Sequence, residues 1–142
     1  MKILLAVDDS KFSEAALKTV TSQYRPQGTQ VRVLHVLQPI AFSAPPQMSP
    51  GYAPELQDQG KEAEKLLQRA AKTLLGAGFQ VDTEIAKGDV REGILDVAQN
   101  WHADMIVLGS HGRGGVGRFL LGSVAESVAR HAPCSVEIVR TR

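Results

Sequence analysis

The chain has 142 residues, of which 43% are hydrophobic and 22% are charged, as expected of a folded protein with a substantial core. Its net charge of +1 argues against a nucleic-acid-binding protein, and its apolar runs are too short to span a membrane. The single cysteine allows no internal disulfide, and no signal peptide is recognised. We therefore expect one cytoplasmic domain over residues 1–142.

The apolar pattern alternates along the chain between short strand-like runs and longer runs with helical spacing. In chain order, we expect a strand at 3–7, a helix at 12–24, a strand at 31–37, a loop at 38–54, a helix at 55–75, a strand at 79–86, a helix at 89–100, a strand at 105–108, a helix at 123–131 and a strand at 135–139. The loop at 38–54 is predicted from its high content of Pro, Ser, Ala and Gln.

Strands that alternate with helices indicate a parallel sheet with right-handed crossovers. Five strands in a chain of this length predict the α/β class, with a doubly wound five-stranded parallel sheet of order 3-2-1-4-5. The first and fourth strands are then neighbours at the switch point, where such sheets bind ligands beyond the strand ends. Asp8 ends the first strand and Gly109 ends the fourth, so both should border one crevice.

A glycine-rich segment after the fourth strand is the most informative motif. It contains Gly109 and Gly112, then nine residues, then Gly122 and Ser123 at the start of the last helix. Glycine allows close approach of a ligand, and a helix N-terminus attracts anions. Gly112 can adopt a positive φ that turns successive amides inward, although for this glycine alone a simple turn is the better interpretation. Ser123 is expected to bind phosphate, and its spacing to Glu126 also predicts a capping box.

Other residues near this motif have two interpretations each. His111 and Arg113 could face phosphate or solvent, and no nucleophile is spaced to make His111 a general base. Asp8 could accept hydrogen bonds from a ribose or hold a metal ion, whose ligands the sequence leaves unassigned. The lysine of a phosphate-binding P-loop is absent, which favours binding over rapid hydrolysis.

These residues resemble the ATP-binding branch of the universal stress protein family. The resemblance covers essentially the whole chain, from the first strand with Asp8 and Ser10 to the run from His131 to Cys134. The family's ATP motif, G-x2-G-x9-G-[S/T], is matched in full by the four residues Gly109, Gly112, Gly122 and Ser123. The implied fold is Rossmann-like, of the adenine-nucleotide alpha-hydrolase type.

The resemblance also implies roles for individual residues. Asp8 would lie near the adenosine, and Val36 would meet the adenine through its backbone. The ribose and phosphates, bridged by Mg²⁺ or Mn²⁺, would be held by Gly109, Gly112, Gly122, Ser123 and the amide of Val124. A homodimer would form through the last strand, with Val136 and Val139 and the residues between them at the interface.

Two residues depart from the family pattern. Asp9 stands where many relatives have glycine, which adds a negative charge at the nucleotide entrance. Glu137 interrupts a strand that is usually apolar, so it is expected to face water or a cation.

The sequence therefore predicts an ATP-binding switch or sensor in a stress response. The alternative is a slow ATPase or phosphotransferase that uses the same site, with Asp8 or His111 positioning water. A third possibility is an interaction protein whose nucleotide motif is vestigial.

Overall fold

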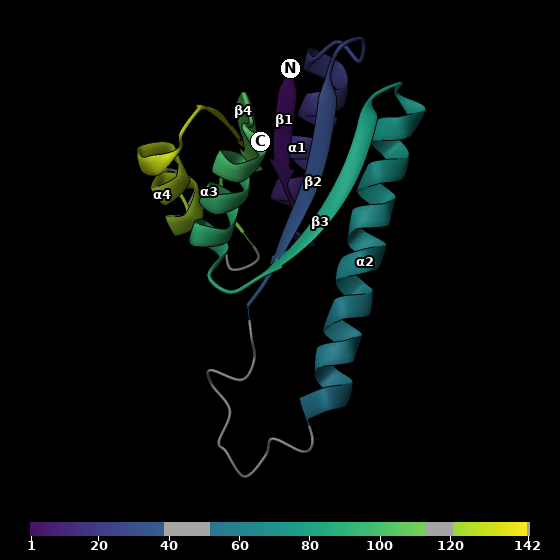
Figure 1. Cartoon of the computed structure of the whole chain (residues 1–142), viewed down its shortest axis with the longest axis vertical. Coiled ribbons are helices and arrows are strands. Elements are labelled where there is room, and N and C mark those ends of the chain that lie inside the picture. The colour runs from purple at the N-terminus through teal and green to yellow at the C-terminus, as the bar shows by residue number, and fades with distance from the viewer. Residues whose placement is uncertain (39–51, 113–120, 142) are drawn as a thin grey trace.

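The computed structural model describes residues 1–38, 52–112 and 121–141. Its five parallel strands form one sheet in the order β3-β2-β1-β4-β5, which confirms the predicted topology (Figure 1). The elements are β1 (Lys2–Ala6), α1 (Lys11–Gln23), β2 (Gln30–Leu37), α2 (Tyr52–Gly76), β3 (Gln80–Lys87), α3 (Val90–Trp101), β4 (Met105–Gly109), α4 (Ser123–His131) and β5 (Ser135–Val139).

The sheet separates two layers of helices. Successive residues of a strand point to opposite faces, so Leu5 packs with α1 and α2 whereas Leu4 packs with α3 and α4. Both faces of the central strand are buried, since Ile3, Leu4 and Leu5 are 0% exposed. This burial explains why the first strand reads as a continuous apolar run rather than an alternating one.

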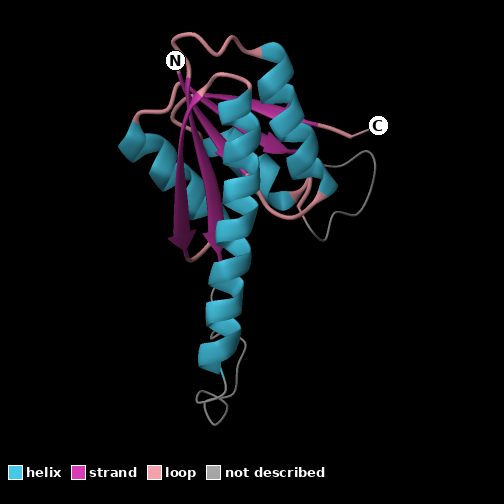
Figure 2. Cartoon of the chain, turned by 90° about the vertical axis from the view of Figure 1, so that its right-hand side faces the viewer, coloured by secondary structure: helices cyan, strands magenta, loops and turns pink. Residues whose placement is uncertain are grey.

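The helix α2 begins three residues before its predicted start. Its first residue is Tyr52, and Pro54 lies in the first turn, where a missing amide hydrogen removes no intrahelical bond. The rest of the predicted loop, residues 39–51, lies outside the described residues. Figure 2 shows that the N-terminal half of α2 extends past the C-terminal ends of the strands.

Polar side chains cap the N-termini of α1 and α3. The Ser10 side chain accepts a hydrogen bond from the Ser13 amide and begins α1, and the Asp89 side chain accepts one from the Glu92 amide and begins α3. At the other end of α3, His102 adopts the left-handed conformation with a φ of 58° and its amide bonds back into the helix. Local hydrogen bonds therefore fix the start of α1 and both ends of α3.

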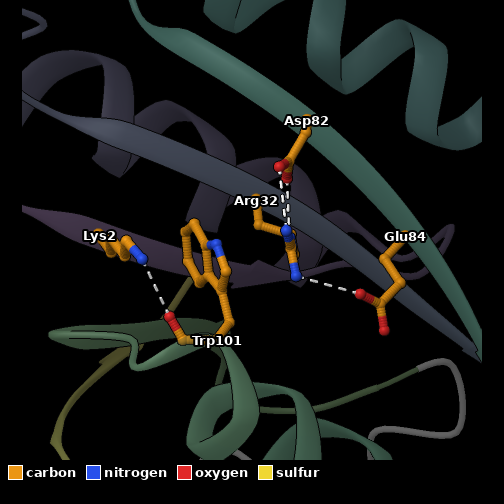
Figure 3. A network of polar contacts seen from close by, with 5 residues as sticks. All are labelled: Lys2, Arg32, Asp82, Glu84 and Trp101. Carbon is orange, nitrogen blue, oxygen red and sulfur yellow. Dashed lines mark hydrogen bonds and ion pairs between the residues drawn. The ribbon is translucent and has the colours of Figure 1, made fainter.

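A polar cluster fastens the C-terminal end of α3 to the sheet (Figure 3). The Arg32 guanidinium bonds Asp82 at 2.8 Å and Glu84 at 3.2 Å, and its Cζ lies 4.7 Å from the centroid of the Trp101 ring. Lys2 Nζ lies 5.4 Å from the same centroid and donates to the Trp101 carbonyl. We call these five residues the Trp101 clip; it joins β1, β2 and β3 to α3.

None of the helices in the described parts of the chain is long and apolar enough to cross a lipid bilayer.

Candidate functional site

A cavity lies at the C-terminal ends of β1, β2 and β4, at the predicted switch point. Its volume is about 110 Å³, and it is bordered by α3 and by the first turn of α4 as well as by the sheet. Six of the nine predicted site residues line it, namely Asp8, Val36, Gly109, His111, Gly112 and Val124. Gly122 and Ser123 lie beside it at the start of α4, and Arg113 lies outside the described residues.

Asp8 is held rigidly at the end of β1. Its Oδ1 accepts hydrogen bonds from the Ser10 amide at 2.8 Å and from the Ser13 hydroxyl at 2.9 Å. The Asp8 amide in turn donates to the Ser13 hydroxyl at 2.7 Å. These bonds use one carboxylate oxygen, and the other, Oδ2, faces Gly112. Asp8 therefore presents a fixed acceptor to the cavity.

Gly109 is required by the fold itself. A Cβ at this position would lie 2.6 Å from the Phe12 Cβ and 2.8 Å from the Phe12 backbone carbon. The first turn of α1 thus packs directly on the end of β4. The sequence suggested that glycine here admits a ligand, but the contact with α1 already accounts for it.

Gly112 does not adopt the positive φ that its sequence position allowed. Among the described glycines, only Gly28, Gly78 and Gly88 have positive φ. Instead, a Cβ at Gly112 would lie 3.2 Å from the Asp8 Oδ2. The absent side chain therefore keeps space open between this loop and the Asp8 carboxylate.

The prediction of a capping box at Ser123 is wrong. Gly122 is the N-cap of α4, with an extended backbone (φ −63°, ψ 157°) and no side-chain cap, and Ser123 is the first helical residue. The Gly122 amide donates to the Ser110 carbonyl at 2.8 Å, and a Cβ at Gly122 would lie 3.0 Å from that oxygen. This contact fixes Gly122 at the cap position. Because glycine has no side chain, the first amides of α4 receive no side-chain acceptor from their cap residue.

His111 lies between this cap and α1. Its Nδ1 is 3.0 Å from the Ser110 hydroxyl, and its ring centroid is 5.1 Å from that of Phe12. The other ring nitrogen, Nε2, is buried and has no hydrogen-bond partner. It is the one such side-chain atom in the described part of the chain.

Sequence reasoning missed some of the cavity's lining. Val90 and Ile94 from α3 and the hydroxyl-bearing Ser13 also border the cavity. The signal for Val90 was available, because a helix that follows a parallel strand begins at the C-terminal edge of the sheet. His35 borders the cavity too, and its Nδ1 lies 2.7 Å from the Val7 carbonyl, so one of its nitrogens serves the fold.

Glu137 on β5, which the sequence predicts to face water or a cation, is half-buried and has a partner that the sequence did not indicate. Its carboxylate accepts a hydrogen bond from the Tyr24 hydroxyl at 2.5 Å, across the sheet face that α1 covers. Burial, together with this bond and the charge of Glu137, raises the pKa of Tyr24 to about 12. The contact ties the end of α1 to the edge strand.

The described residues do not form a metal site by themselves. No group of three or more His, Cys, Asp or Glu side chains in residues 1–38, 52–112 and 121–141 is placed to hold a metal ion. The half-buried Cys134 is remote from the cavity, and burial raises the pKa of its thiol, which disfavours the reactive thiolate.

A doubly wound parallel sheet with helices on both faces and a cavity at its switch point defines a Rossmann-like α/β protein. The profile of the Universal stress protein family matches residues 1–140, and the chain belongs to this family. It is 30% identical to universal stress protein YxiE of Bacillus subtilis, over 98% of each chain. It is 32% identical to a universal stress protein of Mycolicibacterium smegmatis, of which it spans 47%, about half the length.

Solved structures show the same fold. The hypothetical protein MJ0577 superimposes with a TM-score of 0.87 and 30% identity, over 99% of this chain and 96% of that one. The universal stress protein of Archaeoglobus fulgidus, solved in complex with dAMP, has a TM-score of 0.71 and 25% identity over 98% and 97% of the two chains. Two more distant family members, 22% and 20% identical, were solved with cAMP and with AMP respectively, the latter from Arabidopsis thaliana.

Proposed function

We propose that this chain binds an adenine nucleotide at the β1–β4 switch point, with ATP as the expected ligand, and acts as a nucleotide-dependent switch in a stress response. The observation that carries the proposal is the cavity itself, which brings Asp8, Val36 and Val124 together from three distant parts of the chain. Nucleotides bound to related proteins of the same fold support it.

The size and chemistry of the cavity suggest how the ligand lies. Its volume of about 110 Å³ is well below the roughly 300–1,000 Å³ of pockets that enclose a drug-sized ligand. We assign the apolar part, beside Val36 and Ile94, to the flat adenine ring. The Asp8 carboxylate suits the hydroxyl donors of the ribose. The phosphates then lie at the rim, next to the N-terminus of α4, where the helix dipole favours anions.

A divalent cation, Mg²⁺ or Mn²⁺, fits this arrangement only as a companion of the phosphates. The described residues supply no three-ligand group, although the free side of Asp8 offers a carboxylate oxygen of the kind that Mg²⁺ prefers. Most ligands of such an ion would come from the nucleotide and from water.

The edge strand β5 is the proposed homodimer contact, through Val136, Val139 and the residues between them. Ser110 links this strand to the site, because its amide donates to the Val139 carbonyl at 2.8 Å. Nucleotide binding beside Ser110 would in this way alter the edge at which the strands pair, and this link is the basis for proposing a switch. The proposed compartment is the cytoplasm.

The test compares Asp8→Asn with Asp96→Asn, a matched substitution on α3 outside the cavity lining. The asparagine side chain retains an acceptor for Ser10 and Ser13 and replaces the oxygen that faces Gly112 with a donor. We expect titration calorimetry to show ATP affinity lowered about tenfold in Asp8→Asn, equivalent to about 1.4 kcal/mol, and unchanged in Asp96→Asn. Equal affinity in all three proteins would refute the site assignment.

The alternative, a slow ATPase or phosphotransferase, is separated by the ligand that the purified protein retains. Mass spectrometry of released ligand should show ATP if the protein only binds it. ADP or AMP, together with phosphate release that disappears in Asp8→Asn, would favour turnover instead.

A further inference from the structure

The unpartnered nitrogen of His111 requires an explanation. Buried polar atoms in native proteins are nearly always hydrogen-bonded, and an exception indicates a strained group or a missing partner. Nε2 is buried without a partner, while Nδ1 of the same ring is engaged by Ser110, which is 2% exposed. The ring cannot easily turn away, because it is packed against Phe12 on one side and lies near the cap residue Gly122 on another.

The position of the ring indicates what the partner is. A Cβ at Gly122 would lie 3.6 Å from the His111 Cδ2, the ring carbon bonded to Nε2, so this edge of the ring borders the α4 cap. The Asp8 carboxylate instead faces Gly112, on the ribose side of the proposed site. An anion is favoured at the helix end and disfavoured beside the carboxylate. Nε2 therefore belongs to the phosphate side.

We propose that His111 donates an Nε2–H hydrogen bond to a phosphate group of the bound nucleotide, and that Ser110 is the positioning residue that fixes this tautomer. This inference rests on the proposed function. A neutral imidazole carries its proton on one nitrogen only, and a phosphate oxygen requires a donor. When the Ser110 hydroxyl donates to Nδ1, the proton resides on Nε2, and all the polar side-chain atoms of the Ser110–His111 pair are satisfied once phosphate binds.

The predicted consequence is selectivity for nucleotides over nucleosides. A hydrogen bond to a charged group corresponds to a factor of about ten or more in affinity. We expect His111→Phe, which keeps a ring against Phe12 but removes both nitrogens, to weaken AMP and ATP binding about tenfold. Adenosine binding should remain within about a factor of two.

Three further variants make the test specific. His111→Gln places an amide N–H near the position of Nε2 and should recover part of the lost AMP affinity. Ser110→Ala should weaken AMP but not adenosine, and by less than His111→Phe. His131→Phe, at the exposed end of α4, is the matched control and should leave both affinities unchanged. Thermal unfolding of each variant confirms that it is folded.

Nitrogen-15 NMR of histidine in the wild type supplies a readout that a merely structural role would not change. Addition of AMP should shift the His111 Nε2 signal toward that of a hydrogen-bonded N–H, and addition of adenosine should not. If AMP binds the wild type and His111→Phe equally, or if AMP and adenosine weaken together, the inference is wrong while the proposed function stands. If the wild type binds no adenine nucleotide, the proposed function fails, and the inference fails with it.

Discussion

The two ends of the sheet are built in opposite ways. At the N-terminal end, charged groups are paired across elements: the Trp101 clip joins three strands to α3 (Figure 3), and the Lys2 amide donates to Asp104 at 2.7 Å. At the C-terminal end, the chain presents a glycine helix cap without a side-chain acceptor and a buried histidine nitrogen without a partner.

The difference separates stability from binding. A satisfied polar network fixes the packing of the elements that it joins, whereas an unsatisfied one stores a cost that a ligand can relieve. Natural proteins depart from full satisfaction mainly at functional sites. Substitutions at the N-terminal end should therefore lower stability and spare binding, and those at Gly112 and His111 should do the reverse.

The largest effect is expected at Trp101. Its ring packs against the core on the α3 face and is flanked by Lys2 and Arg32. Trp101→Ala should lower the free energy of unfolding by about 3 kcal/mol, from lost apolar packing and lost cation–π contacts. Urea unfolding measures this, and titration calorimetry should show unchanged ATP affinity.

Trp101→Phe is the control for this prediction. It retains a ring face for Arg32, and the bond from Lys2 to the carbonyl of residue 101 does not depend on the side chain. The expected loss is about 1 kcal/mol. A substantial fall in ATP affinity in either variant would mean that the two ends of the sheet are coupled, and the comparison would not hold.

Two glycines at the C-terminal end of the sheet test which residues there serve stability and which serve ligand binding. Gly109→Ala would bring a Cβ to 2.8 Å from the Phe12 backbone, which is unable to yield as a side chain would. The expected loss of stability is about 2 kcal/mol, by overpacking. Gly112→Ala would place its Cβ 3.2 Å from the Asp8 Oδ2. We expect little loss of stability there and about a tenfold loss of ATP affinity, or about 1.4 kcal/mol.

The result decides which glycine serves the ligand. Unfolding and calorimetry on both variants should give opposite patterns. If Gly109→Ala is stable and defective in binding, the packing of α1 on β4 is not the reason for that glycine, and the original interpretation from the sequence would be restored.

The sequence was sufficient for the fold because apolar periodicity carries that information. The apolar run at residues 3–7 and the alternation of strand-like and helical segments predicted the sheet order that the structure confirms. Contacts between distant side chains were not predictable in the same way. The pairing of Arg32 with Asp82 follows from their register in neighbouring strands, which is known only once the sheet is assembled.

The candidate site was predictable to the level of residues but not of atoms. The glycine motif and Asp8 located the cavity, since strand ends meet at the switch point. The reason for each glycine lay elsewhere: Gly109 is explained by Phe12, which is far away in the sequence, and Gly122 by the Ser110 carbonyl. Backbone angles at Gly112 and the cap of α4 depend on these contacts, which residue spacing does not encode.

The smallest predicted effect depends on pH and concerns the contact between the end of α1 and the edge strand β5. Tyr24 follows α1 and donates to Glu137 on β5, and its pKa in the folded state is about 12, above the ordinary value of 10.0. Because the folded state holds this proton more tightly, the contribution of Tyr24 to stability is fully present below pH 10 and is lost as the pH rises through 12.

At neutral pH, Tyr24→Phe should cost about 1 kcal/mol. Urea unfolding of both proteins from neutral pH up to pH 12 should show this difference shrinking at the alkaline end, with ATP affinity at neutral pH equal in the two. A difference that stays constant over the whole range would mean that Tyr24 stabilises the fold by packing alone, and the hydrogen bond to Glu137 would have no measurable part in holding α1 to the edge strand.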